Sequence, residues 1–260
     1  MGVPTIWAIG SDGKMLSSLT DPDLVFAQLL DTSWSVPGLL DIVAQAANPP
    51  YNSLIDTGAL ITGLSNLEVA RYLLMHGLAH CKGVVFLDDM DRKMILIRSS
   101  MKVVPLNHSG IEENKRFAFY DQVHTTGMDI PHKPNAVAAL TLGKDMTFRD
   151  FAQGAYRMRG FGIGQTVHLF LIPVIRKLIS KHCAKAGMHM PTQINTTVAA
   201  DRKQMLLAVS AWLIVNSMNS ERVQANMLTI QNVTNVWRKQ CFQYLLDRHT
   251  DFGKATAQPE

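Results

Sequence analysis

The sequence predicts an α/β protein, with a mostly parallel β-sheet and a helical C-terminal extension. Between residues 51 and 175, short apolar runs alternate with capped helical segments, which is the pattern of strands connected by helices. Several runs are apolar throughout, as expected for strands buried on both faces of a parallel sheet. From residue 176 onward, only helical patterns remain.

The composition excludes several classes of protein. With 260 residues, 47% of them hydrophobic and 18% charged, the chain is large enough for a buried core and too apolar to be disordered. No apolar run approaches the roughly 20 residues that span a bilayer, so no membrane partner is expected. Three widely spaced cysteines and the lack of a signal-peptide pattern predict a reducing, intracellular location, cytoplasmic or nuclear.

Three regions are expected along the chain. Residues 1–50 show no strong periodicity and only one helical segment, Leu39–Ala46, so they are interpreted as a lead-in, the tail of a preceding region. Residues 51–175 form the α/β domain, and residues 176–260 form the helical extension.

Within the α/β domain, each element is predicted from a local signal. Ser65 and Glu68 have capping-box spacing and begin a helix that ends before Gly77. A second helix begins after Thr147 and reaches about Met158. The expected strands are Ser53–Ile61, Gly83–Leu87, Met94–Arg98, Arg116–Asp121, Ala136–Leu142 and Thr166–Pro173.

The C-terminal extension is predicted as three helices: Val174–Ala186, Asp201–Met218 and Glu221–His249. On the third, apolar positions recur at alternating steps of four and three, a coiled-coil-like seam. Its members are Val223, Met227, Ile230, Thr234, Trp237, Cys241 and Tyr244. Polar residues inside the seam favour a helix packed on its own domain over an intermolecular zipper.

The C-terminal third is also basic, with 11 basic and 5 acidic side chains and a net charge of +6. Such a surface suits phosphate or an acidic partner. The alternative is that these charges only cover solvated helix faces, because they are scattered at helical spacing.

One stretch combines a turn and a helix that carry candidate binding residues. Gly127 allows a turn that presents Asp129, and the helix after Thr147 bears Gln153, Arg157 and Arg159. Arginine suits phosphate because its planar fork donates two parallel hydrogen bonds. We expect these polar groups to face a shared cleft, where they meet a phosphate or a partner domain.

The alternative is that Arg157 forms a buried pair with Asp129 inside the chain. On a continuous helix, Arg157 and Arg159 lie about 200° apart, so both reach one site only where the helix has unwound.

The order of elements in this stretch resembles the second RecA-like domain of superfamily 2 helicases. The shared features are a strand, a Gly-x-Asp-x-Pro turn at Gly127–Pro131, another strand, and a helix with a glutamine and two arginines. The pattern departs at Tyr156, where the helicases have glycine, and at Arg159, which follows Arg157 by two residues instead of three. The resemblance implies a RecA-like fold of helicase C-terminal type that contacts nucleotide or nucleic acid.

Longer matching segments are similar to a C-terminal region of very large, poorly characterised eukaryotic proteins commonly labelled ubiquitinyl hydrolase. These segments are Leu54–Asn66 with Glu68–Ala70, Asp121–Asp129, Ala138–Gly143 and Gln153–Arg159. The resemblance covers residues 53–175 and implies a thiol-protease activity in the ubiquitin pathway. It also implies that the chain belongs to, or is a short relative of, a larger protein, with that protein's other domains and ubiquitin as partners.

Neither activity has a complete site in this sequence. A phosphate-binding loop of the Gly-x4-Gly-Lys-Ser/Thr type is absent, so no ATP site is expected. No bound cofactor and no metal are expected either. Cys81 and Cys183 each directly follow a histidine, but neighbours on a helix point about 100° apart and do not form a catalytic pair. His124, with Asp121 to orient it, is the best-placed catalytic candidate, and its alternative role is to cap a turn.

The sequence therefore favours a domain of a larger protein that binds phosphate, nucleotide or partner surfaces without a complete ATP site. The alternative is part of a ubiquitin-directed cysteine hydrolase whose nucleophile lies outside this chain.

Overall fold

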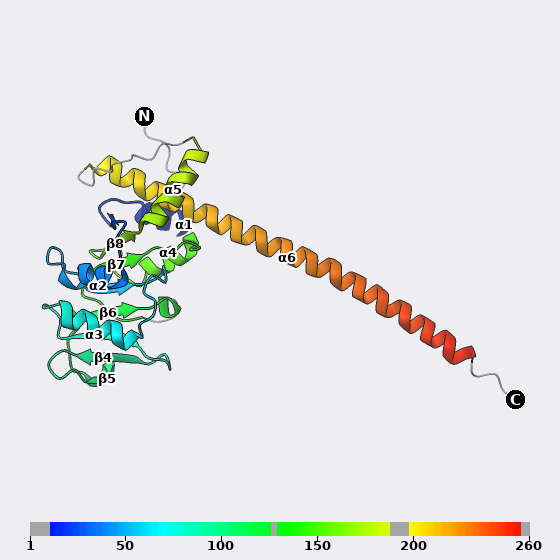
Figure 1. Ribbon diagram of the computed structural model, residues 1–260, viewed down its shortest axis with the longest axis horizontal. Helices are drawn as coiled ribbons and strands as arrows, with labels where there is room; N and C mark the ends of the chain where they lie inside the picture. Colours follow the sequence, from blue (N-terminus) through cyan, green and yellow to red (C-terminus); the bar gives the residue numbers. More distant parts are fainter. Residues whose placement is uncertain (1–10, 126–128, 188–197, 256–260) are drawn as a thin grey trace. The chain divides into compact units, whose positions relative to one another are not determined.

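The computed structural model describes residues 11–125, 129–187 and 198–255, which divide into two compact units, Met1–Asn216 and Ser217–Glu260. The described residues of the first unit include one eight-stranded sheet, in the order β1-β8-β7-β2-β6-β3-β4-β5 (Figure 1). The strands are β1 Val25–Leu29, β2 Ser53–Ile55, β3 Gly83–Leu87, β4 Lys93–Ile97, β5 Val103–Pro105, β6 Arg116–Tyr120, β7 Val137–Thr141 and β8 Thr166–Leu171.

The sheet is mostly parallel, as predicted. Strands β1, β8, β7, β2, β6 and β3 pair in parallel, and β4 and β5 continue the sheet as antiparallel strands. Every residue of β2, β3 and β7 is buried, which explains why these segments are continuously apolar or small. Strands β3 and β4 form an antiparallel hairpin, and its turn holds Asp88, Asp89 and Asp91.

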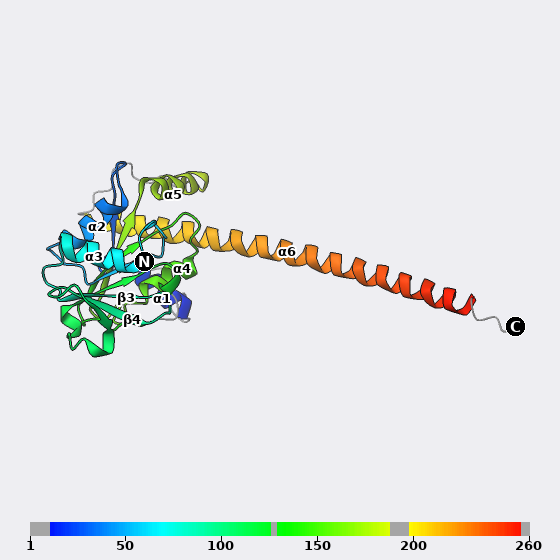
Figure 2. The same ribbon diagram turned by 60° about the horizontal axis from the view of Figure 1, so that its bottom comes forward.

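The described residues form six α-helices, three of which are crossovers between parallel strands. The helices are α1 Ser11–Leu19, α2 Val36–Gln45, α3 Asn66–His76, α4 Phe148–Ala155, α5 Pro173–Lys185 and α6 Ala199–Ala255, with short 3-10 turns η2 Leu106–His108, η3 Glu113–Lys115 and η4 Val123–Thr125. Helices α2 and α3 lie on one face of the sheet and α4 on the other (Figure 2). Right-handed crossovers that run in opposite directions along a sheet place their helices on opposite faces.

Two predicted helix starts are confirmed in detail. The Ser65 side chain accepts a hydrogen bond from the backbone of Glu68, whose carboxylate accepts from the Ser65 backbone. Thr147 and Asp150 make the same reciprocal capping box at α4. These caps satisfy N–H groups that have no partner in the first turn of a helix.

The predicted lead-in is wrong for part of its length, because it supplies an edge strand of the sheet. Strand β1 pairs in parallel with β8, with Val25 opposite Val167 and Leu29 opposite Leu171. Its sequence is short and includes Gln28, so it lacks the continuous apolar run that marks the central strands. Residues 11–50 thus belong to the same unit as the rest of the sheet.

The two last predicted helices are a single helix, α6. The segment between them holds asparagine and serine but neither glycine nor proline, so helix propensity falls without a strong break. Up to Asn216, α6 belongs to the first unit, where Val209, Trp212 and Leu213 are buried. In the second unit, every described side chain from Met218 to His249 is exposed. The apolar seam predicted on this helix is therefore exposed along its whole length.

None of the helices in the described ranges combines the length and the apolar character that crossing a bilayer requires.

Candidate functional site

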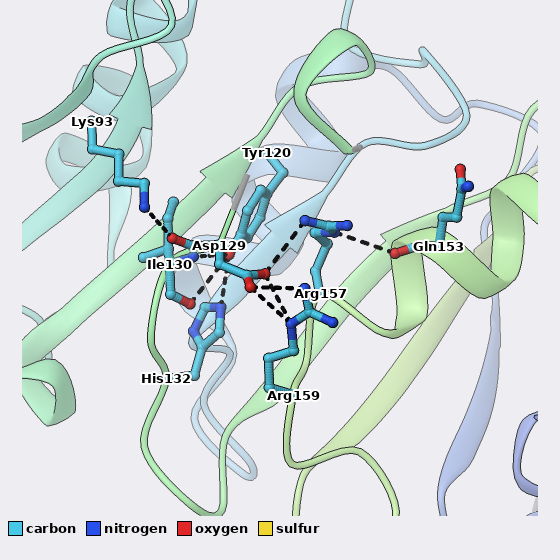
Figure 3. Close-up of polar contacts among 8 residues, drawn as sticks. All are labelled: Lys93, Tyr120, Asp129, Ile130, His132, Gln153, Arg157 and Arg159. Atoms are coloured by element: carbon cyan, nitrogen blue, oxygen red, sulfur yellow. Dashed lines mark hydrogen bonds and ion pairs between the residues drawn. The ribbon is translucent and has the colours of Figure 1, made fainter. Parts of the chain in front are cut away.

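The carboxylate of Asp129 is the centre of an ion-pair cluster near the carboxyl ends of β3 and β6 (Figure 3). Arg159 binds it with two nitrogens: Nε lies 2.9 and 3.0 Å from the two carboxylate oxygens, and Nη2 lies 2.7 Å from Oδ2. Arg157 reaches the same carboxylate from another side, with Nη1 3.4 Å from Oδ1. The hydrogen bond from Arg159, and next to it the charges of Arg159 and Arg157, hold the pKa of Asp129 below its ordinary value.

Both arginines reach one carboxylate because α4 ends earlier than predicted. The last helical residue is Ala155, and Tyr156 is the C-cap. Arg157 and Arg159 therefore lie in the turn that follows α4, where the 200° separation of a continuous helix does not apply. The helix was expected to continue to about Met158, and this boundary decides the geometry of the site.

The two arginines differ in exposure. Arg157 is buried, with 9% of its surface exposed, whereas 63% of the Arg159 side chain is exposed. Arg157 therefore does not face outward as expected. It pairs with Asp129, as in the alternative, but the pair is only partly buried because 52% of the Asp129 side chain is exposed. Arg159 keeps Nη1 without a partner among the described residues, so it has donors left for another oxygen.

Of the remaining predicted binding residues, Gln153 contributes only its backbone oxygen to the surroundings of the cluster. The Gln153 backbone oxygen lies 3.4 Å from Nε of Arg157, but its side-chain amide points away from the arginines (Figure 3). Gly127 lies outside the described residues. Among the described residues, the structure therefore brings together Asp129, Arg157 and Arg159 of the groups expected to share a cleft.

Residues that were not predicted from the sequence hold the segment Asp129–His132, called here the Asp129 segment, in place. The Tyr120 hydroxyl, at the end of β6, accepts a hydrogen bond from the Ile130 backbone N–H at 3.1 Å and lies 3.2 Å from Nε2 of His132. Burial lowers the pKa of His132 to about 4, so this ring is neutral near pH 7. Lys93, the first residue of β4, donates to the backbone oxygen of Asp129 at 2.5 Å. Only the position of Tyr120 at a strand end was a signal for this role.

Lys93 also borders a groove of about 590 Å³ beside the Asp129 segment. Arg92, Arg116 and Pro131 line the same groove. Arg92 is paired with Asp88, its Nη2 lying 2.7 Å from the carboxylate. The described residues that line the groove include three cationic side chains, those of Arg92, Lys93 and Arg116, and no acidic one.

The crevice where open parallel sheets usually bind ligands is closed in this protein. The connections after β2 and β7 leave in opposite directions, which makes this pair the expected binding position. Here the two strand ends touch: a Cβ atom on Gly58 would lie 2.6 Å from the carbonyl carbon of Leu142. Buried Asp56 accepts from Thr141 Oγ1 at 2.5 Å and from the backbone of Ile61 at 2.9 Å. Asp56 therefore organises the turn, and burial raises its pKa despite these hydrogen bonds.

His124 has both ring nitrogens occupied. Nδ1 lies 2.5 Å from Asp121 and Nε2 lies 2.7 Å from Asp91 in the β3–β4 turn. A catalytic base needs one free nitrogen, so the alternative role, a structural link between turns, fits this geometry better. Burial lowers the pKa of His124, but the hydrogen bonds to Asp91 and Asp121 outweigh burial and raise it above 6.5.

The cysteines of the first unit do not form a nucleophile site. Cys81 and Cys183 are buried, and burial raises the pKa of the Cys81 thiol to about 12 and also raises that of Cys183. Such thiols stay protonated near pH 7 and are poor nucleophiles. Cys241 is exposed in the second unit. Across the part of the chain that the structure describes, no group of His, Cys, Asp and Glu side chains is placed to hold a metal ion.

Comparison with known proteins gave no relative: no family model, no curated protein and no solved structure matches this chain. The fold and the cluster around Asp129 are therefore the basis of the functional argument.

Proposed function

We propose that this chain is a RecA-like domain of helicase C-terminal type that binds phosphate groups or acidic partner surfaces within a larger protein, without an ATP site of its own. The observation that carries this proposal is the cationic groove beside Asp129. Arg159 lies in the turn after α4, and its exposed guanidinium is held in one orientation by the carboxylate of Asp129. A pre-oriented guanidinium loses less conformational entropy when it binds an oxyanion.

The closed crevice between β2 and β7 supports binding without catalysis. Phosphate-binding loops need open backbone N–H groups between a strand and a helix, but the Gly58 N–H donates to Thr141 Oγ1 at 3.0 Å. A phosphate would instead be held by side-chain cations at the protein surface. Nucleotide is thus bound as a polyanion, and the chain alone does not hydrolyse it.

The test is the binding of ATP and of a single-stranded RNA at two salt concentrations. Binding through several cations should weaken steeply with salt. Arg159→Ala should lower the affinity by about tenfold, since a charge-assisted bidentate contact is worth about 1.4 kcal/mol or more. Arg149→Ala is the matched control, because Arg149 is an exposed arginine on α4 away from the cluster. Equal binding by both variants would contradict the proposal, and so would ATP turnover by the purified chain.

A second candidate is the ubiquitin-directed hydrolase with its nucleophile outside this chain. Cys81 and Cys183 are buried, which favours a nucleophile outside this chain over one of these two cysteines. A reactive ubiquitin probe should leave all three cysteines unlabelled. Saturable binding of unmodified ubiquitin, with no binding of RNA, would favour this candidate over the first.

A further inference from the structure

A second pocket, which shares no residue with the cationic groove, lies between α2 and strands β1 and β8. Its volume is about 350 Å³, within the range of small-molecule sites. The lining residues include Gln28, Ile42, Gln45, Tyr51 and His168. No Asp, Glu, Lys or Arg is among the described residues that line it, so the pocket walls are uncharged.

A chain of hydrogen bonds fixes the state of the histidine in this pocket. The Tyr51 hydroxyl donates its only proton to Oε1 of Gln28 at 3.1 Å. Its oxygen lies 2.9 Å from Nδ1 of His168, so it must accept a hydrogen bond from Nδ1–H. His168 therefore carries its proton on Nδ1, and Nε2 presents a lone pair.

That lone pair has no partner among the described residues. Burial lowers the pKa of His168 to about 4, so the ring stays neutral near pH 7 and Nε2 accepts hydrogen bonds. Tyr51 is 3% exposed, and Gln28 and His168 are partly buried beside it. An acceptor beside a pocket, held in one tautomer by the buried Tyr51 hydroxyl, is preorganised for a ligand that donates a hydrogen bond.

Two rings, those of Tyr51 and His168, line the pocket. The Tyr51 and His168 rings meet edge to face, with centroids 5.2 Å apart and an interplanar angle of 89°. Phe26 is not among the described lining residues, but its ring packs against His168, with centroids 5.0 Å apart. Flat ring surfaces favour a planar ligand, and the side-chain amides of Gln28 and Gln45 offer both donors and acceptors around it.

We propose that this pocket binds a neutral, planar nitrogen heterocycle that donates an N–H to Nε2 of His168, the chemistry of a nucleobase or a heterocyclic amide. The uncharged lining disfavours an anionic ligand, because no cation among the described lining residues offsets the loss of its hydration. The site is independent of phosphate binding at Asp129, so each proposal can fail without the other.

Uracil, adenine and nicotinamide are the probes, with benzoate as a planar anion for comparison. Histidine ring signals of the whole chain are followed by NMR at pH 7 during each titration. At least one neutral probe should shift the His168 signals saturably, with a Kd of about 1 mM for a ligand of this size. Benzoate should not, and the rings of His76 and His108 outside the pocket should stay unchanged.

Two variants test the recognition. His168→Phe keeps a planar ring but removes Nε2, and it should weaken binding by about tenfold, the usual loss for one hydrogen bond. Gln45→Ala changes an exposed residue of the pocket rim, so it leaves the fold intact and should weaken binding by about threefold. The proposal is overturned by an absence of saturable shifts up to about ten times the expected Kd, by equal binding of benzoate, or by undiminished binding in either folded variant.

Discussion

Replacing Arg157 should cost more stability than replacing Arg159, although Arg159 makes the shorter contacts. The Arg157–Asp129 distance is 3.4 Å, at which two charges attract by about 1 kcal/mol in water and about 5 kcal/mol at the effective dielectric constant of a protein. Asp129 is half exposed, at 52% of its side chain, so we expect about 2 kcal/mol for Arg157→Ala. Arg159 and its carboxylate are both open to solvent, and exposed ion pairs contribute about 0–1 kcal/mol.

The assay is urea unfolding followed by circular dichroism, with the slopes compared to confirm equal exposure of surface. For a unit of this size, about 2 kcal/mol lowers the Tm by about 4–8 °C. Arg157→Met, which keeps the buried aliphatic stem, separates the loss of charge from the loss of packing, and Arg149→Ala supplies the surface control. The reasoning is refuted if Arg159→Ala is the more destabilising change, or if Arg157→Ala unfolds within about 0.5 kcal/mol of the parent chain.

Three further predictions concern other parts of the chain. A thiol reagent at neutral pH should modify exposed Cys241 and leave Cys81, whose pKa burial raises to about 12, unmodified until the protein unfolds; early labelling of Cys81 in the native state would contradict its burial. Folding raises the pKa of His124 above 6.5. The ion pair between protonated His124 and Asp91 should therefore stabilise the fold fully below about pH 6.5, and this stabilisation should be lost as the pH rises through the pKa of the folded state. Asp91→Asn should therefore reduce stability more at about pH 5.5 than at about pH 8.5, and equal losses in urea melts would argue against the link. Gly58→Ala should cost more than about 3 kcal/mol or prevent folding, because its Cβ would lie 2.6 Å from backbone; a variant that melts near the parent would show that the strand ends can separate.

The elements predicted well from sequence are those whose signals are local. Strands β3 and β7 are continuous apolar segments, and the capping boxes at Ser65 and Thr147 mark helix starts within four residues. Strand β5 was missed because it has three residues, two of them exposed, and ends at a proline. Its place in the sheet depends on pairing with β4, which no periodicity within the strand reveals.

The candidate site could be predicted only in part for the same reason. The sequence singled out Asp129 and both arginines and offered an internal pair as one arrangement. It did not show that α4 ends at Ala155, because Tyr156 and Arg157 are acceptable helix residues and the turn is decided by contacts with distant loops. The Tyr120–Ile130 hydrogen bond also joins residues ten positions apart, and it exists only once β6 has found its place in the sheet.

Helix α6 carries two tryptophans in opposite surroundings. Trp212 is 2% exposed in the first unit, and Trp237 is 67% exposed in the second. An indole shielded from water fluoresces at shorter wavelengths than a hydrated one, and a hydrated one is quenched first by iodide. Single-tryptophan variants that keep one or the other would therefore give each unit its own optical signal. A blue shift of Trp237 would report that something covers the apolar seam, while the emission of Trp212 would report that the sheet domain is still folded.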